Sequence, residues 1–389
     1  MNAVSAQDAS TNTKVSLAEL AFVFLKLGTT AFGGPAAHIA MMQNEFVRKR
    51  RWISDTEFLD RIAAASLIPG PTSTEVAIFI GYSMRGWAGL ILAGCCFIIP
   101  AAVLVGLMAA AYVRFESLPQ VSGILYGIKP AVIAVILQAL WGLGRTAAKT
   151  TLLIALGLIS AFLSFAGVAP VVVLAATGLA SAVGFFLKTR KSLPLVSTPL
   201  TKSSALLLWA AAAAASAPIS LIRLFLSFLK IGSVVFGSGY VLLAFLRAEF
   251  VDHLHWLTEK QLIDAVAVGQ FTPGPVFTTA TFIGYLVAGA RGSVLATTAI
   301  FLPGFFFVAL SGPLLPGIRR SPLAAAVLDG VVIASLALMA VVAWQLGRAA
   351  IVDWLAFTIL IVSSALLLRF RINSAWVIVG AAFVGWLTH

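Results

Sequence analysis

Charged residues are scarce in this sequence. Asp, Glu, Lys and Arg together make up 10% of the 389 residues, whereas a soluble domain carries about 25%. Hydrophobic residues make up 60%. Because a soluble core cannot bury this much apolar surface, lipid must solvate part of it. The composition therefore excludes an ordinary soluble domain and predicts a membrane protein.

Cysteine is nearly lacking as well, and the motifs of cofactor-dependent proteins are absent. The two cysteines, Cys95 and Cys96, are neighbours in an apolar run, and adjacent cysteines rarely form a disulfide or hold a metal. No phosphate-binding loop, dinucleotide-binding glycine pattern or haem motif occurs. The sequence therefore predicts no cofactor, no metal site and no ATP-driven pump.

Strand-like alternation of apolar and polar residues is missing, which argues against a barrel. Long apolar runs are present instead, such as residues 88–112 and 294–315. A helix needs about 20 apolar residues to cross the hydrocarbon layer, so the sequence has room for about ten to thirteen inserted helices. We predict an all-α fold, a polytopic transmembrane helix bundle with broken or re-entrant helices.

The net charge of +12 comes largely from clusters of Lys and Arg between the apolar runs, at residues 48–51, 188–191 and 319–320. Such clusters orient membrane proteins, since Lys and Arg favour cytoplasmic loops. The lipid bilayer is therefore the predicted partner of this charge, and nucleic acid is not.

Much of the chain occurs twice. Phe-Leu-Lys-Leu-Gly at 24–28 returns as Phe-Leu-Lys-Ile-Gly at 228–232, Pro-Gly-Pro at 69–71 returns at 273–275, and Leu-Gly-Arg at 143–145 returns at 346–348. These matches indicate a duplication. The predicted organisation is a polar, disordered lead-in (1–16), a first transmembrane repeat (17–187), a linker with room for an extra helix (188–220) and a second repeat (221–389).

The two copies differ in loop charge. Residues 45–61 carry five basic residues, whereas residues 249–265 carry Lys260 against four acids. Equivalent loops with opposite charge bias are expected on opposite sides of the membrane. We therefore predict inverted repeats, which secondary transporters use for alternating access. Parallel halves are the alternative.

Each copy contains two helix breaks, at 32–35 and 68–71 in the first and at 236–239 and 272–275 in the second. Pro and Gly interrupt helices, and broken backbone at membrane depth is tolerated where it is buried in protein or lines a wet cavity. A hinge or kink for packing is the alternative. The candidate substrate-binding residues at the breaks are Gly33, Gly34, Pro69, Gly70, Pro71, Gly237, Gly239, Pro273, Gly274 and Pro275.

Hydroxyl side chains follow both Pro-Gly-Pro sequences, where new helices are expected to begin. The free N–H groups and partial positive charge of a helix N-terminus suit an oxyanion. The candidates here are Thr72, Ser73, Thr74, Thr278 and Thr279.

A lysine recurs in the first helix of each copy, at Lys26 and Lys230. If that helix begins near Leu17, Lys26 lies about 13 Å along it. This depth is near the middle of the bilayer, where a charge is costly and usually functional. A later helix start would let the lysine reach the interface. We predict that both lysines are counter-charges for an anion.

Carboxylates inside or beside the apolar segments are candidates for proton coupling. They are Glu45, Glu249, Asp60, Asp264 and Glu75. The first four form two repeat-matched pairs, for which salt bridges or helix caps, for example with Arg48 or Arg61, are the alternative. Glu75 has Thr279 as its mate. Among the histidines, His38 beside the first break is the one to test.

The chain resembles the chromate transporter family, in particular its long two-domain members. The motifs that carry this resemblance are Phe-Leu-Lys-Leu-Gly at 24–28, Phe-Gly-Gly-Pro at 32–35, Arg-Trp-Ile at 51–53 and Pro-Gly-Pro at 69–71. The resemblance implies oppositely oriented halves in a bacterial inner membrane and proton-driven export of chromate that confers chromate resistance. The second copy has Gly-Ser-Gly at 237–239 in place of Gly-Gly-Pro, which implies that the first copy carries more of the binding.

The predicted function is therefore efflux of a tetrahedral oxyanion by proton-coupled antiport. Chromate or a sulfate-like oxyanion and protons are the predicted partners, and a homodimer is left open. Transport of sulfate or another oxyanion is the near alternative. A membrane-embedded enzyme would need converging titratable groups, and a scaffold would leave the intramembrane lysines unexplained. We predict that the chain is not an enzyme.

Overall fold

The computed structural model describes residues 15–32, 34–115, 119–189, 220–236, 239, 241–319, 321–370 and 372–388. Regular secondary structure in these ranges is helical throughout, so the predicted all-α fold is confirmed. Most of the lead-in and linker, including the segment 205–217 in which an extra helix was expected, lies outside the described residues, as do Gly33 and Gly237.

The two halves contain the same series of elements, except for one additional short 3-10 helix in the second. The first half has α1 (Leu17–Thr30), α2 (Gly34–Met42), η1 (Gln43–Lys49), α3 (Asp55–Ala65), α4 (Thr72–Phe115), α5 (Pro119–Ala147), α6 (Thr151–Phe165) and α7 (Pro170–Thr189). The second has α8 (Leu221–Val234), α9 (Leu242–Leu246), η4 (Arg247–His253), α10 (Glu259–Phe271), η5 (Val276–Thr278), α11 (Thr279–Arg319), α12 (Pro322–Ala350), α13 (Trp354–Leu368) and α14 (Ser374–Thr388). Even the π-helices η1 and η4 fall at equivalent positions.

In the part of the chain that the structure describes, five helices are long and apolar enough to cross a membrane: α4, α5, α7, α11 and α12. Three more, α6, α13 and α14, are apolar but shorter. Large apolar side chains such as Leu158, Phe162, Leu179 and Trp376 are exposed on these helices. Exposed apolar faces of this kind are what a lipid-embedded bundle requires.

The two longest helices fold back on themselves. α4 leaves helical geometry at Arg85 and Gly86, and α11 does so at the equivalent residues Ala288 and Gly289. A Cβ added to Gly89 would lie 2.1 Å from the carbonyl oxygen of Gly81, although residues eight apart in a straight helix are about 12 Å apart. Each long helix is therefore a hairpin of two helices.

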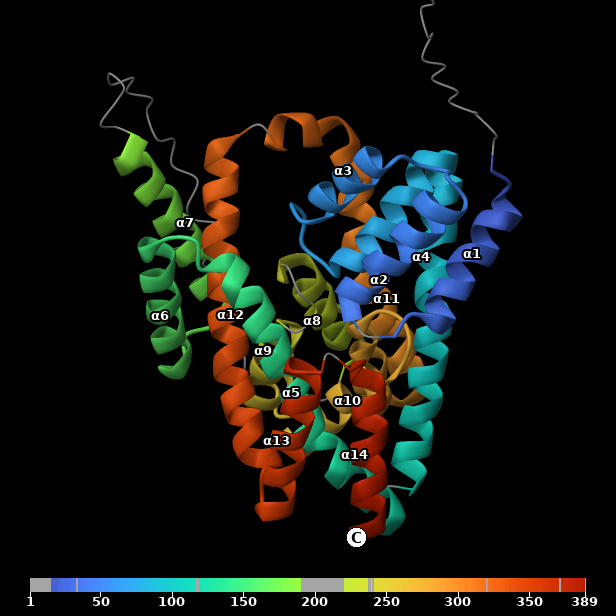
Figure 1. Ribbon diagram of the computed structural model, residues 1–389, viewed down its shortest axis with the longest axis vertical. Helices are drawn as coiled ribbons and strands as arrows, with labels where there is room; N and C mark the ends of the chain where they lie inside the picture. Colours follow the sequence, from blue (N-terminus) through green and yellow to red (C-terminus); the bar gives the residue numbers. More distant parts are fainter. Residues whose placement is uncertain are drawn as a thin grey trace, which may run out of the picture.

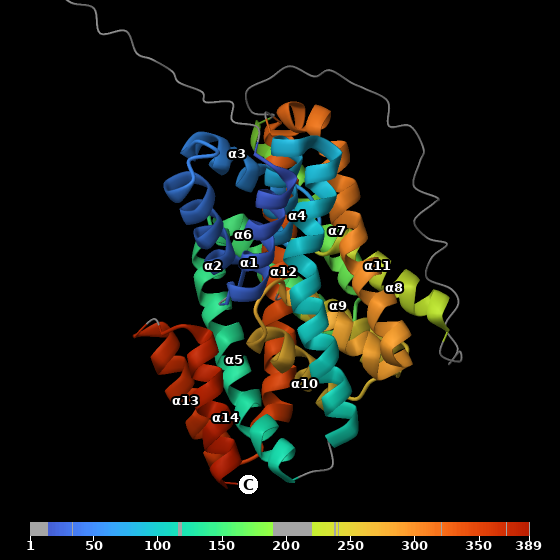
Figure 2. The same cartoon turned by 90° about the vertical axis from the view of Figure 1, so that its right-hand side faces the viewer.

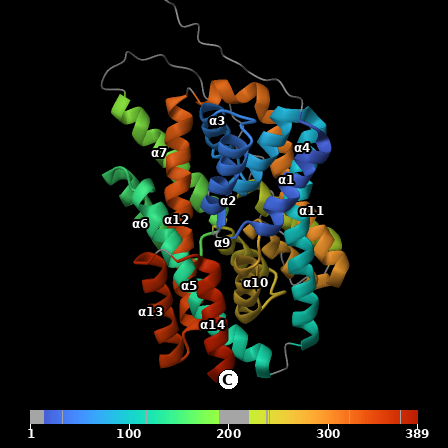
Figure 3. The same cartoon turned by 45° about the vertical axis from the view of Figure 1, so that its right-hand side comes forward.

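The last two helices of each half pack on the other half. α6 and α7 pack against α12, whereas α13 and α14 pack against α5. Figures 1 and 3 show the red pair α13 and α14 beside α5 and the green pair α6 and α7 beside α12. The hairpin helices α4 and α11 also pack against each other. The halves are thus interlocked through exchanged helix pairs.

Glycine allows the exchanged helices to approach closely. A Cβ on Gly127 of α5 would lie 1.9 Å from the backbone oxygen of Ala381 in α14. We expect Gly127→Ala to destabilise the protein by about 1–3 kcal/mol, because helix backbones must separate. Thermal unfolding of the detergent-purified protein measures this. Gly380→Ala in α14 is the control, since nothing lies within 4 Å of its Cβ; equal loss of stability in both variants would contradict the packing argument.

The ends of the long helices lie at opposite ends of the molecule in the two halves. α4 ends and α5 begins at the lower end in Figures 1 and 2, whereas α11 ends and α12 begins at the upper end. α3 lies at the upper end and its equivalent α10 lies in the lower half of the bundle.

Candidate functional site

The two Pro-Gly-Pro turns reach across to the opposite half. The N–H of Gly70 donates to the carbonyl of Val235 at 2.7 Å, and the N–H of Gly274 donates to the carbonyl of Ala31 at 2.9 Å. Ala31 and Val235 are equivalent residues that follow the ends of α1 and α8. The structure therefore joins the first break of each half to the second break of the other, by reciprocal hydrogen bonds.

Both turns require glycine. Gly70 has φ +136° and Gly274 has φ +94°, values that residues with a side chain rarely adopt. A Cβ on Gly274 would lie 2.6 Å from the Cβ of Ala101 in α4. A Cβ on Gly70 would lie 2.1 Å from the Oε1 atom of Glu75. The turns are thus close contacts, and their flanking residues Pro71, Pro273 and Pro275 are buried, with Pro69 half-buried.

Glu75 packs against the Gly70 turn. It stands in the first turn of α4 and is 0% exposed. Its carboxyl faces Gly70 on one side and approaches Gly304 of α11 on the other. Among the described residues neither carboxyl oxygen has a hydrogen-bond partner, and neither does the hydroxyl of Thr74. Such a carboxyl is costly to ionise unless water or a donor reaches it.

The remaining hydroxyls differ between the copies. Thr278 and Thr279 donate to the backbone carbonyls of Pro275 and Val276. α4 begins at Thr72 as predicted, but the second turn is followed by the short 3-10 helix η5 before α11 begins at Thr279. The hydroxyls of Thr278 and Thr279 are therefore satisfied within the second copy, whereas the hydroxyl of Thr74 in the first copy has no partner among the described residues.

His38 connects the first break to α4. Its Nε2 lies 3.1 Å from the carbonyl oxygen of Ala31 and its Nδ1 lies 3.2 Å from the hydroxyl of Ser73. Because a carbonyl can only accept, Nε2 donates to Ala31, and in a neutral ring Nδ1 accepts from Ser73. The same Ala31 carbonyl accepts from Gly274. His38 thus positions the backbone that holds the opposite turn.

The matched lysines lie near the matched glutamates. The Nζ of Lys230 is 2.6 Å from Glu249, and its side chain is 52% exposed. Ser227 also donates to Glu249. Lys26 is exposed and forms no ion pair within the described part of the chain. The structure therefore pairs Lys230 with the π-helix η4 of its own half, and the charge of Lys26 acts on Glu45 in η1.

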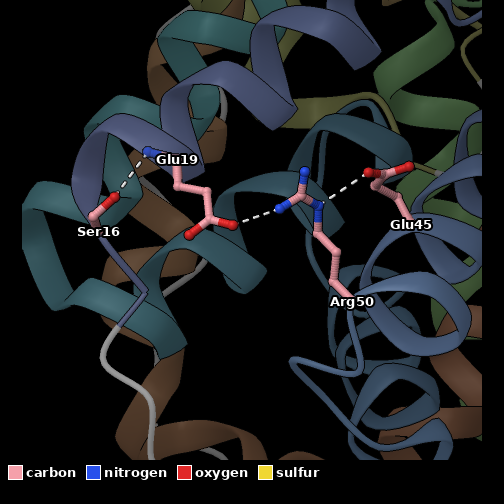
Figure 4. Close-up of polar contacts among 4 residues, drawn as sticks. All are labelled: Ser16, Glu19, Glu45 and Arg50. Atoms are coloured by element: carbon pink, nitrogen blue, oxygen red, sulfur yellow. Dashed lines mark hydrogen bonds and ion pairs between the residues drawn. The ribbon is translucent and has the colours of Figure 1, made fainter.

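Glu45 in η1 has a different set of partners from Glu249. Arg50 donates to Glu45 at 3.0 Å and to Glu19 at 2.6 Å, so that it joins η1 to α1 (Figure 4). Lys49 lies 3.6 Å from Glu45. Burial disfavours the Glu45 anion, but the hydrogen bond from Arg50 and the charges of Lys26, Lys49 and Arg50 outweigh it and lower the pKa of Glu45. Arg50 and Lys49 therefore hold this carboxylate, in place of the Arg48 or Arg61 considered from the sequence.

The matched aspartates occupy unlike environments. Asp60 is exposed, whereas Asp264 in α10 is 0% exposed. Lys129 of α5 lies 3.1 Å from Asp264, and the hydroxyl of Tyr112 donates to Asp264 at 2.9 Å. Sequence reasoning missed Lys129 and Tyr112. The position of Lys129, next to Pro130 in an apolar run, was a signal that could have identified it. The repeat gives no second signal, because the equivalent residue in the other copy is Val332.

Two of the candidate glycines at the first break of each half, Gly34 and Gly239, lie within the described residues. Gly34 begins α2 with φ +78°, and a Cβ on Gly239 would lie 3.4 Å from Val276. The first breaks therefore also lie beside the turns.

A helical bundle with two sister halves and discontinuous helices that meet between them defines a class of multi-pass membrane proteins. The sequence profile described as "Chromate transporter" matches residues 18–182 and again residues 222–386. The chain belongs to the chromate transporter family.

Three relatives are similar to the chain over nearly their whole length. The chain is 33% identical to the "Chromate transport protein" of Cupriavidus metallidurans, with 96% of this chain and 94% of the relative covered. It is 31% identical to the "Probable chromate transport protein" of Synechococcus elongatus, with 95% of each covered. It is 30% identical to the "Chromate transport protein" of Pseudomonas aeruginosa, with 94% and 90% covered. No solved structure matches the chain.

Proposed function

We propose that this protein exports chromate, or an oxyanion of the same charge and shape, across a bacterial inner membrane in exchange for protons. The observation that carries the proposal is the reciprocal bonding of the Pro-Gly-Pro turns, with the buried Glu75 packed against the Gly70 turn. Membership of the family and the names of the relatives favour chromate as the anion.

The proposal includes inverted halves that rock against each other. The opposite placement of the α4–α5 and α11–α12 ends in Figures 1 and 2 supports it, as does the opposite charge of the equivalent loops. Two cross-bonded turns midway between the halves can break and re-form as one half moves, which alternating access requires. The boundaries 17–187 and 221–389 remain our proposed limits of the halves.

Glu75 is the proposed proton carrier. In the described conformation its carboxyl is fully buried and has no hydrogen-bond partner among the described residues, which favours the protonated form. Ionisation requires water or a donor, and therefore separation of the Gly70 turn from Gly304. Proton release is thus linked to opening of the contact between the halves. Antiport follows if the oxyanion binds the opened form.

The lysines are the proposed counter-charges, with the start of α4 supplying an N–H donor at Ser73. Lys26 has the freer ammonium group, since Lys230 is held by Glu249. The asymmetry of the hydroxyls also favours the first copy as the main binding half.

We expect Lys26→Ala to lower chromate flux at least about tenfold, because one charge-assisted contact to the anion is removed. Flux is measured in membrane vesicles, with the amount of inserted protein measured on the same samples. Lys149→Ala is the control, since Lys149 pairs with Asp329 at an exposed position. Wild-type flux in Lys26→Ala would remove Lys26 from the binding site.

The function itself is tested with inverted vesicles, radiolabelled chromate and an imposed proton gradient. Gradient-dependent uptake is the expected result, and its absence in vesicles that contain the inserted protein would reject proton-coupled export. Sulfate is the second candidate substrate, because it is also a tetrahedral dianion. Strong competition by sulfate together with direct sulfate uptake would assign it as a substrate.

A further inference from the structure

Gln270 carries a buried side-chain amide near the end of α10. The residue is 9% exposed, and among the described residues its Nε2 atom has no hydrogen-bond partner. An amide nitrogen has two N–H donors, and it is costly to leave them unpaired in a buried position. Such a group is expected to have a further partner, which is either water or a bound ligand.

The end of α10 lies in the contact region between the halves. It leads into the Gly274 turn, whose N–H donates to the carbonyl of Ala31 in the first half at 2.9 Å. A Cβ on Gly269 would lie 2.2 Å from the Oγ1 atom of Thr279, the first residue of α11. α10 also packs against α4 and α5 of the first half. Gln270 therefore belongs to the broken-helix region of the second half.

The end of α10 is also arranged so that its own carbonyls are occupied. A helix C-terminus ordinarily disfavours anions, because its last carbonyls have no partner within the helix. Here the hydroxyl of Thr272 donates to the carbonyls of Val268 and Gly269, at 3.1 and 3.3 Å. The N–H of Thr272 donates to Val268 as well, at 3.1 Å. These bonds reduce the repulsion that an anion would meet beside Gln270.

The first half has no equivalent of this amide. The residue that corresponds to Gln270 is Ser66, which is exposed and donates to the carbonyl of Ile62 in its own helix at 2.8 Å. The first half instead has the buried carboxyl of Glu75, which also lacks a hydrogen-bond partner among the described residues. A carboxylate only accepts hydrogen bonds, whereas an amide N–H can donate to an anion.

We propose that Gln270 is the contact of the second half with the transported oxyanion, to which its amide N–H groups donate. The choice of ligand rests on the proposed function. The amide is neutral, so it recognises the oxygen atoms of the dianion without adding a charge that would slow release. An oxyanion held by α4 of the first half and by Gln270 of the second stabilises the arrangement in which both reach it. Anion binding is thereby linked to the relative position of the halves.

The test compares anion binding with stability in Gln270→Met, which has a similar side-chain length but no N–H donor. The Kd of radiolabelled chromate and of sulfate is measured on the full-length protein in detergent. We expect Kd to rise at least about tenfold, the effect of losing a hydrogen bond to a charged ligand. The melting temperature without anion should stay the same or rise, because a buried donor without a protein partner has been removed.

Gln138→Met is the matched control. The Nε2 of Gln138 in α5 donates to the carbonyl of Leu367 in α13 at 3.2 Å, so the same replacement here removes a donor that has a partner. We expect its melting temperature to fall and its Kd to stay within about twofold of the wild-type value. Gln270→Leu, which also lacks the donor, is the second variant if Gln270→Met does not insert into the membrane, and the same results are expected from it.

An unchanged Kd in the Gln270 variants would show that the amide binds water alone, and would overturn the inference. A melting temperature that falls as far as in Gln138→Met would assign the amide a structural role, with the same consequence. If vesicles transport chromate normally with Gln270→Met, this contact fails while the proposed export stands. If binding depends on Gln270 but wild-type vesicles show no gradient-dependent uptake, the proposed export fails while the contact stands.

Discussion

Glu75→Gln is expected to abolish the response of chromate flux to a proton gradient and to lower the driven flux at least about tenfold. Glutamine keeps the size of the side chain between Gly70 and Gly304 but cannot release a proton. The packed contact of the halves should therefore persist, because the amide is neutral, as the protonated carboxyl is. The measurement is chromate uptake by inverted vesicles at several imposed pH differences.

The control for this prediction is Glu57→Gln. Glu57 is an exposed carboxylate that completes the capping box at the start of α3 by accepting from the N–H of Ser54. Glutamine can accept in the same way, so its flux should match that of the wild-type protein. A Glu75→Gln protein that still follows the proton gradient would show that the proton is carried elsewhere.

The second large effect is expected from Gly274→Ala. An alanine at positive φ costs about 1–2 kcal/mol, and here its Cβ would also overlap the Cβ of Ala101 at 2.6 Å. The turn must shift, which weakens its hydrogen bond to the carbonyl of Ala31. We expect a lower melting temperature and loss of most transport, measured on the same purified and reconstituted protein.

Two further variants separate strain from packing at this turn. Gly289→Ala also places alanine at positive φ, +62°, but nothing lies within 4 Å of its Cβ, so it measures the conformational cost alone. Ala101→Gly combined with Gly274→Ala removes the overlap and should recover part of the lost stability and flux. If the double variant is no better than Gly274→Ala, the contact with Ala101 does not matter.

Much of the architecture could be predicted because it depends on local sequence. The apolar runs predicted the helical bundle, and the repeated motifs predicted two sister halves. The Pro-Gly-Pro sequences predicted the turns that precede α4 and α11. These features follow from composition, helix breakers and duplication.

The partners of the charged residues could not be predicted in the same way. From the sequence we predicted that Lys230 is a counter-charge for an anion. In the structure it donates to Glu249, nineteen positions further along the chain. Lys129 and Asp264 are far apart in sequence and meet because α5 and α10 pack together. Repeat-matched positions could not point to Lys129, since the equivalent residue in the second half is Val332. Pairings of this kind are set by tertiary packing.

The exchange of terminal helix pairs bears on how the protein is made. α5 and α12 each receive two helices that belong to the other half, so the surface of α5 that receives α13 and α14 is incomplete until the ribosome has translated the end of the chain. During synthesis the first half must therefore remain in the bilayer with this surface of α5 uncovered. In that state it is accessible to the proteases that remove unfinished membrane proteins. Truncation anywhere after α7 would therefore damage the part already inserted as well as remove the part never made.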